Sequence, residues 1–186
     1  MSPRIGLDLP AILEAAVEIA DKQGIQEVTL ASLAQKLNIR PPSLYNHVNG
    51  LQGLRTRLAI HGLEQLHSAM TNAAVGRAGE DAIRAMGEAY VEFARVHPGL
   101  YEATLLIPPT QDPDVEKTGS KIVELTVRVL KSFGLEGDMA LHATRGLRSL
   151  FHGFASLEQK GGFGIPLDLN VSSVCSSMPF WRECTR

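Results

Sequence analysis

The chain of 186 residues lacks the sequence features that characterise several large protein classes. Its two cysteines, Cys175 and Cys184, both lie near the C-terminus and are too few to build a disulfide framework. No apolar run approaches the length that spans a membrane. The first residues also lack the apolar stretch of a secretory signal peptide. We therefore expect a protein of the reducing cytoplasm with no membrane partner.

An excess of charge of one sign is also absent. The sequence has 18 Lys and Arg against 20 Asp and Glu, a net charge of −2, which excludes a polycation that coats nucleic acid and an acidic disordered tail. The positive charge is nevertheless concentrated in residues 26–60, where four basic residues face one acidic residue, Glu27. Such a segment can bind a polyanion locally, although ordinary surface charge accounts for the same count.

The motifs of common enzymes and metal sites are missing. None of the six histidines forms His-Glu-x-x-His, and His61 and His67 do not share a helix face. There is no Cys-x-x-Cys, Walker loop, dinucleotide fingerprint or Gly-x-Ser-x-Gly. The glycine-rich run at 161–164 follows an expected helix, which favours a helix C-cap and a turn. The sequence predicts no catalytic residue, no metal site and no cofactor, so we do not expect an enzyme.

Apolar residues repeat at a spacing of three to four nearly throughout, and no convincing alternating strand occurs, so the sequence predicts an all-α fold. A first helix begins after Asp8 as its cap, with Pro10 in the first turn, and ends at Gly24. Thr29 is a natural N-cap for a short second helix. Pro41 and its neighbours open a short third helix, because proline is tolerated in a first turn. These three helices make a head domain, residues 1–50.

Residues 51–186 are expected to form a second, helical-bundle domain. Its helices are expected at about 51–73, 83–96, 100–107, 114–133 and 138–160, with a last one from Asp168. The helix at 114–133 is apolar almost all round, which predicts a buried central helix. Asp138 is expected to cap the next helix. That helix carries a stripe that suits either the core or a dimer surface: Leu147, Leu150, Phe151, Phe154 and Leu157.

Residues 29–48 have the pattern of a helix-turn-helix, two short helices joined by the turn Asn38–Arg40. Ala34 is small enough for the helices to cross closely, and the apolar residues around it bury the crossing. The outer face then carries residues suited to base edges: Arg40, Pro41, Ser43 and Asn46. The residues suited to phosphate oxygens are Thr29, Ser32, Tyr45 and His47.

Residues 28–59, "VTLASLAQKLNIRPPSLYNHVNGLQGLRTRLA", resemble the tetracycline-repressor (TetR) family of one-component transcription regulators. The resemblance implies a DNA-binding head, and it implies that Tyr45 and His47 hold phosphates. Many members have a Lys at the start of the following helix, where this chain has Leu51. Arg55 and Arg57 are the candidates to replace it.

Residues 148–170, "RSLFHGFASLEQKGGFGIPLDLN", are similar to the C-terminal domain of a TetR subgroup with a Trp-His-Gly signature. Here His152-Gly153 stands in the sequence "FHGF", so a tryptophan is missing. In related proteins this helix and the next form a dimer bundle, which implies a homodimer on a near-palindromic operator. The segment 171–186 contains Pro179, four Ser and two Cys, which makes a poor amphipathic helix.

The resemblance implies a repressor whose body senses a small molecule. A set of mostly apolar residues could line a cavity for a mostly apolar ligand, although plain core explains each of them as well: Met86, Tyr90, Phe93, Tyr101, Leu105, Phe151 and His152. The ligand would act by binding two arrangements of the protein unequally. The alternative hypothesis is a helical protein-interaction module without sequence-specific DNA binding, against which the basic segment and the polar outer face both argue.

Overall fold

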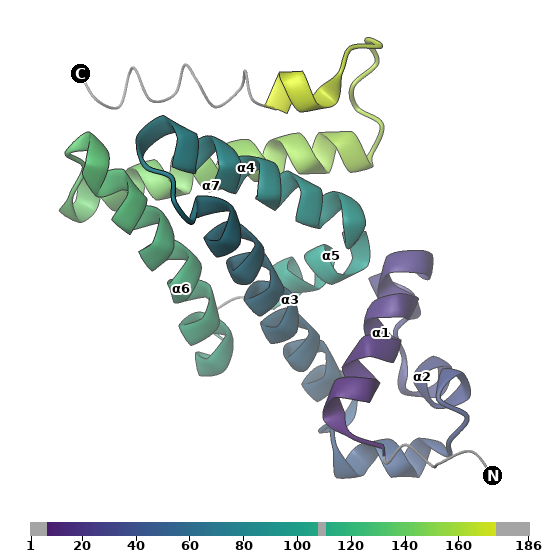
Figure 1. The fold of residues 1–186 in the computed structure, drawn as a ribbon. Helices are drawn as coiled ribbons and strands as arrows, with labels where there is room; N and C mark the ends of the chain where they lie inside the picture. Colours follow the sequence, from purple (N-terminus) through teal and green to yellow (C-terminus); the bar gives the residue numbers. More distant parts are fainter. Residues whose placement is uncertain (1–6, 108–110, 174–186) are drawn as a thin grey trace. The chain divides into compact units, whose positions relative to one another are not determined.

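In a computed structural model of the chain, the structure describes residues 7–107 and 111–173. Over these residues every regular element is a helix, which confirms the predicted all-α class. Figure 1 shows the elements in chain order, and they are α1 (Leu9–Gln23), η1 (Ile25–Glu27), α2 (Leu30–Lys36), η2 (Pro41–Asn46), α3 (Gly50–Ala74), α4 (Gly79–Val96), α5 (Pro98–Leu106), α6 (Pro113–Leu130), η4 (Lys131–Phe133) and α7 (Gly137–Gln159). Here η denotes a 3₁₀ helix.

The first helix begins and ends where its local sequence predicts. The Asp8 carboxylate accepts a hydrogen bond from the Ala11 amide at 2.9 Å, and Pro10 lies in the first turn of α1. Gly24 follows the last residue of α1 with a φ of 98°, and its amide donates to the Ala20 carbonyl. A residue with a side chain rarely adopts this φ, so the glycine ends the helix.

The chain divides into two compact units. Unit 1 comprises residues 1–63 and 97–116, and unit 2 comprises residues 64–96 and 117–186. Unit 1 thus contains α5 as well as the helices of the expected head domain. The functional division of the chain at residue 50 stays a prediction.

In unit 1, α1 and α5 are joined by the side chain of Asp21. Its Oδ1 accepts hydrogen bonds from the amides of Gly99 and Leu100, both at 2.9 Å, and its Oδ2 lies 2.8 Å from His97 Nδ1. The first amides of a helix have no partner within the helix, so this carboxylate caps α5. A Cβ on Gly99 would lie 2.1 Å from the Ala20 backbone, so glycine is required where α5 contacts α1.

In unit 2, α4 and α7 pack closely around one phenylalanine. A Cβ on Gly87 would lie 2.5 Å from the ring of Phe151, so the ring occupies the space that this glycine leaves on α4. The Phe151 ring also contacts Tyr90 at a centroid distance of 5.7 Å. Both rings are buried, and together they form the aromatic part of the α4–α7 contact.

An ion pair of Arg95 with Glu158 joins the end of α4 to the end of α7. Its Nε and Nη2 donate to Glu158 Oε1 at 3.1 and 2.9 Å, and Gln159 Nε2 donates to the Ala94 carbonyl at 2.7 Å. Burial disfavours the charge of Arg95, but the hydrogen bonds and charges of Glu158 and Glu92 outweigh it and raise the pKa of the guanidinium. The two carboxylates therefore favour the charged form of Arg95.

Two expectations for the second half of the chain are wrong, and a third stays open. The helix over 113–130 is amphipathic rather than buried all round: its buried positions are Val115, Thr118, Thr126 and Leu130, and its charged residues cover an exposed face. Asp138 lies inside the first turn of α7, and Glu136 occupies the N-cap position without a side-chain hydrogen bond. In the stripe on α7, Leu157 is 50% exposed, so the choice between core and dimer surface stays open.

The C-terminal region is described as far as residue 173. A helical turn over 169–173 follows Asp168, as expected, and Asp168 Oδ1 accepts from the Asn170 amide at 2.8 Å. Phe163, in the preceding loop, contacts Phe154 of α7 at a centroid distance of 4.9 Å. The rest of the expected last helix lies outside the described residues, as do residues 108–110 between α5 and α6.

We predict that Gly99→Ala lowers the free energy of unfolding by about 3 kcal/mol, because the new methyl group meets backbone atoms that cannot move aside. Gly119→Ala is the control: a Cβ there meets nothing within 4 Å, and alanine favours the helix by about 0.5–1 kcal/mol. Urea unfolding measures both values. Equal stability of the two variants would show that α5 does not lie this close to α1.

Candidate nucleic-acid interface

The first helix of the predicted helix-turn-helix, α2, begins with a capping box. Thr29 Oγ1 accepts from the Ser32 amide at 3.0 Å, and Ser32 Oγ accepts from the Thr29 amide at 3.0 Å. The Ser32 hydroxyl also donates to the Glu27 carbonyl at 2.7 Å. Both predicted phosphate-binding hydroxyls thus already hold α2 in place.

The turn after α2 is formed by Asn38, which has a φ of 53°. Asparagine tolerates this left-handed conformation better than most residues. The turn is closed by a hydrogen bond of 3.0 Å from the Ile39 amide to the Ala34 carbonyl. Leu33, Ala34 and Leu44 are all buried, which confirms that small and apolar residues form the crossing of α2 with the next helix.

The second helix of the motif, η2, is a 3₁₀ helix, which sequence reasoning did not foresee. Its amides bond three residues back, as from Ser43 to Arg40 at 3.0 Å and from His47 to Leu44 at 2.9 Å. The adjacent prolines, Pro41 and Pro42, have no amide hydrogen to donate, which favours a short element. The buried Leu44 anchors η2, and most of its other side chains are exposed.

The structure gathers the predicted base and phosphate residues of η2 on one small element. Tyr45 is 59% exposed, and Arg40, Pro41 and Asn46 are exposed as well. Ser43 and His47 are half-buried. A side chain must be exposed in this way to reach a groove of DNA.

The charge around η2 is positive. The sequence contains no Asp or Glu from residue 28 to residue 63. Lys36 reaches Glu18 of α1 at 2.8 Å, and its hydrogen bond and charge, with those of Lys22, hold the pKa of Glu18 below its ordinary value. Arg40 takes part in no ion pair within the described part of the chain, so its charge is available to an external anion.

The residues predicted to line an effector cavity are distributed over both units. Unit 2 contains Met86, Tyr90, Phe93 and Phe151, all buried, and the half-buried His152. In unit 1, Tyr101 is buried and Leu105 is 41% exposed. The contact of Tyr90 with Phe151 places two of the predicted residues side by side.

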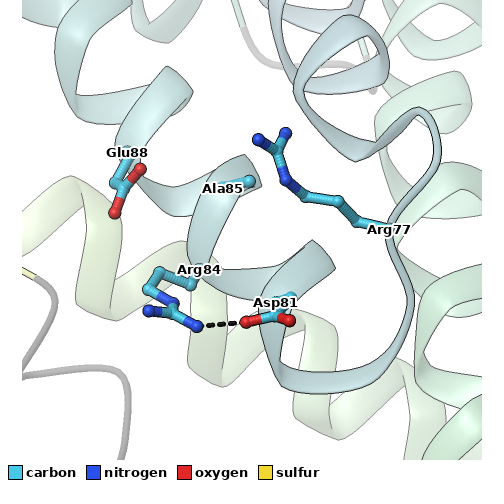
Figure 2. Close-up of a pocket in the computed structure, with 5 residues that line it drawn as sticks. All are labelled: Arg77, Asp81, Arg84, Ala85 and Glu88. Carbon is cyan, nitrogen blue, oxygen red and sulfur yellow. Dashed lines mark hydrogen bonds and ion pairs between the residues drawn. The ribbon is translucent and has the colours of Figure 1, made fainter.

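A surface pocket of about 330 Å³ lies elsewhere in unit 2, at the start of α4 (Figure 2). Its lining is mostly charged and shares no residue with the predicted effector set: Arg77, Asp81, Arg84, Ala85 and Glu88. Arg84 is paired with Asp81, and the Arg77 guanidinium donates to the Ala73 carbonyl. In the sequence, the indication of this pocket was limited to the three-residue spacing of Asp81 and Arg84, and such a pair is common on exposed helices.

Residues 7–107 and 111–173 contain neither a cluster of metal ligands nor a helix that could span a membrane. No group of three or more His, Cys, Asp or Glu side chains is placed to hold a metal ion. None of the helices there is both long and apolar enough to cross a membrane.

Known proteins resemble both the sequence and the fold. The sequence model of the family described as "Tetracyclin repressor-like, C-terminal domain" matches residues 83–173. A relative from Bacillus subtilis, the uncharacterized HTH-type transcriptional regulator YobS, is 48% identical over 164 residues, which cover 88% of this chain and 85% of YobS. The chain belongs to the TetR family of transcriptional regulators.

Solved structures agree with this TetR fold over nearly the whole chain. A protein of unknown function from Rhodococcus sp. RHA1 has a TM-score of 0.84 at 24% identity, with 100% of both chains covered. The TetR regulator SCO7222 from Streptomyces coelicolor has a TM-score of 0.75 at 20% identity, covering 96% of this chain and 98% of its own. Membership of the TetR family makes the chain a DNA-binding transcription regulator rather than an enzyme, and homodimers and ligand response are typical of that family.

We predict that Lys36→Gln raises the pKa of Glu18 toward its ordinary value, because Lys36 makes the largest contribution to lowering it. A carboxyl with a lowered folded-state pKa adds stability above its unfolded-state pKa, and this stability is lost as the pH falls through the folded-state pKa. An NMR titration of the Glu18 side chain measures the shift. Lys22→Gln, whose Nζ lies 3.5 Å from the same carboxylate, should raise the pKa less. An unchanged Glu18 pKa in Lys36→Gln would contradict the assignment.

Proposed function

We propose that this TetR-family regulator binds a two-fold symmetric operator as a cytoplasmic homodimer, with η2 in the major groove of each half-site. The residues proposed to read bases are Arg40, Pro41, Ser43 and Asn46. Tyr45 and His47 hold phosphates beside them. Thr29 and Ser32 serve the same interface by fixing the start of α2, since their hydroxyls are already engaged there.

The observation that carries this proposal is the exposed polar surface of η2 around a fully buried Leu44. A buried anchor fixes the element, so its exposed side chains meet DNA without a large loss of conformational entropy. The stretch without acidic residues around η2 adds an attraction for phosphate that does not depend on base sequence.

A homodimer through α7 is supported by Gly153, a glycine that no contact within the chain explains. Gly153 lies in the middle of α7, and a Cβ there would meet nothing within 4 Å. A glycine at such a position costs about 0.5–1 kcal/mol relative to alanine. Close approach of α7 from a second copy explains it, and two heads about 34 Å apart can then read a near-palindrome. The similarity of residues 148–170 to the Trp-His-Gly subgroup belongs to the same proposal.

We further propose that unit 2 binds a small, mostly apolar effector among its buried apolar residues, and that this binding releases the repressor from its operator. Met86, Tyr90, Phe93 and Phe151 offer apolar surface, and the half-buried His152 offers a polar group to orient the ligand. Tyr101 and Leu105 of unit 1 remain proposed contacts. The ligand can act only if it binds the DNA-competent and the released arrangements with different affinity.

We predict that Tyr45→Phe weakens binding to operator and to random DNA alike, by about 10-fold, because one hydrogen bond to a charged phosphate is lost. Asn46→Ala should instead reduce the preference for operator over random DNA by about 5- to 100-fold, because a base contact is lost. Fluorescence anisotropy with DNA flanking the chain's own gene and a scrambled duplex, at two salt concentrations, measures both effects.

Asn170→Ala, at an exposed asparagine of unit 2, is the matched control and should leave both affinities unchanged. If Tyr45→Phe and Asn46→Ala both bind like the unaltered protein, η2 is not the element that contacts DNA.

We predict that Gly153→Leu prevents dimer formation while the fold is retained, because the side chain fits within its own chain but fills the space of the partner helix. Gly119→Leu, at a helical glycine of α6 that also has no neighbour within 4 Å, is the control and should remain dimeric. Sedimentation equilibrium gives the masses, and circular dichroism checks the fold. A dimeric Gly153→Leu variant would refute α7 as the dimer surface.

A further inference from the structure

The charged surface pocket of unit 2 has the size of a small-molecule site. Its volume of about 330 Å³ lies at the low end of the range of roughly 300–1,000 Å³ that ligand pockets occupy. Four of the five side chains that line it carry a charge, and the fifth is the methyl group of Ala85. A lining of this kind suits a small, charged and water-soluble molecule, in contrast to the apolar effector proposed for the buried residues of the same unit.

Arg77 forms one side of the pocket and is held in place by the end of α3. Its guanidinium donates to the Ala73 carbonyl, and its backbone amide donates to the Ala74 carbonyl at 3.1 Å. Figure 2 shows the side chain extending from the connection between α3 and α4 toward Ala85. A guanidinium has five N–H donors, so most of them remain for a ligand. Arg77 therefore offers a positive group whose position is already fixed.

Glu88 supplies the opposite charge in the same pocket. Asp81 and Arg84 also line it, but they form an ion pair and so neutralise each other. Within the described part of the chain, neither Arg77 nor Glu88 takes part in an ion pair. The pocket therefore contains one positive and one negative group without a partner of opposite charge.

The space between these two groups is not filled by a side chain of α4. Ala85 is buried and small, and it lines the pocket with Glu88, which follows three residues later on the same helix. Three residues of an α-helix rise by about 4.5 Å, so Glu88 lies nearly one turn beyond Ala85. A ligand that contacts both charges thus has room for a short apolar stem over Ala85.

We propose that this pocket binds a small zwitterion, with its carboxylate on Arg77 and its ammonium group on Glu88. A guanidinium can hold both oxygens of a carboxylate through parallel N–H donors. A simple anion would be repelled by Glu88 and a simple cation by Arg77, so the pair of charges favours a molecule that carries both. The site shares no residue with η2 or with the proposed effector contacts, so it does not depend on either proposal.

The test is an NMR titration of the full-length protein at constant ionic strength with three probes of similar length. The probes are γ-aminobutyrate, which carries both charges, butyrate, which carries only the carboxylate, and butylamine, which carries only the ammonium group. The zwitterion should shift the amide signals of residues 77–88, and it should bind about 2- to 5-fold more tightly than either other probe, the gain expected from one exposed ion pair.

Two variants assign the charged ends of the ligand. Arg77→Gln should weaken γ-aminobutyrate binding by about 2- to 5-fold without changing that of butylamine, and Glu88→Gln should weaken it equally without changing that of butyrate. Both residues are exposed, so the fold should be retained. The matched controls are Arg128→Gln and Glu124→Gln, at exposed residues of α6 that do not line the pocket, and both should bind like the unaltered protein.

Several results would overturn this assignment. Butyrate or butylamine that binds as tightly as γ-aminobutyrate would mean that the pocket does not select a zwitterion. Signals that shift only outside residues 77–88, or no shift with any probe, would mean that this pocket is not a ligand site. Because no DNA is present in the titration, its failure leaves the proposed function of η2 untouched, which Tyr45→Phe tests separately.

Discussion

The cap that Asp21 places on α5 is the contact on which unit 1 depends. One carboxylate on α1 accepts from two amides at the start of α5, 78 and 79 residues further along the chain, and its negative charge lies at the positive end of that helix. Gly99 makes the short distance between α5 and α1 possible, because any side chain there would collide with the Ala20 backbone. The first helix of unit 1 is therefore held by a helix from the middle of the chain.

The residues of the proposed DNA interface are held by few contacts, each well defined. Thr29 and Ser32 cap α2, Asn38 makes the turn, and Leu44 anchors η2 in the core of unit 1. This short 3₁₀ helix carries Tyr45 and Asn46 outward. Its brevity is compatible with recognition, because only a few side chains on one element need to reach base edges.

Local features of the first half were predicted well, and longer-range features were not. Asp8, Gly24 and Thr29 act within four residues of their own positions, so their capping roles follow from residue type and order. Asp138 satisfies the same pattern but lies inside the helix, because Glu136 two residues before it takes the cap position. The helix at 113–130 was predicted to be buried all round because its apolar residues are numerous. Its charged residues nevertheless determine which face is exposed to solvent.

The sequence by itself determined the all-α class, the helix-turn-helix and the family, because helix periodicity, caps and turn residues are short-range properties. It also indicated the polar residues of η2. Only the tertiary structure decided that Asp21 caps α5, that Phe151 fills the space left by Gly87, and that Arg77 and Glu88 line one pocket without an ion pair to any described residue. These features depend on which segments distant in sequence come into contact, and on what a folded chain leaves without a partner, neither of which a local pattern contains.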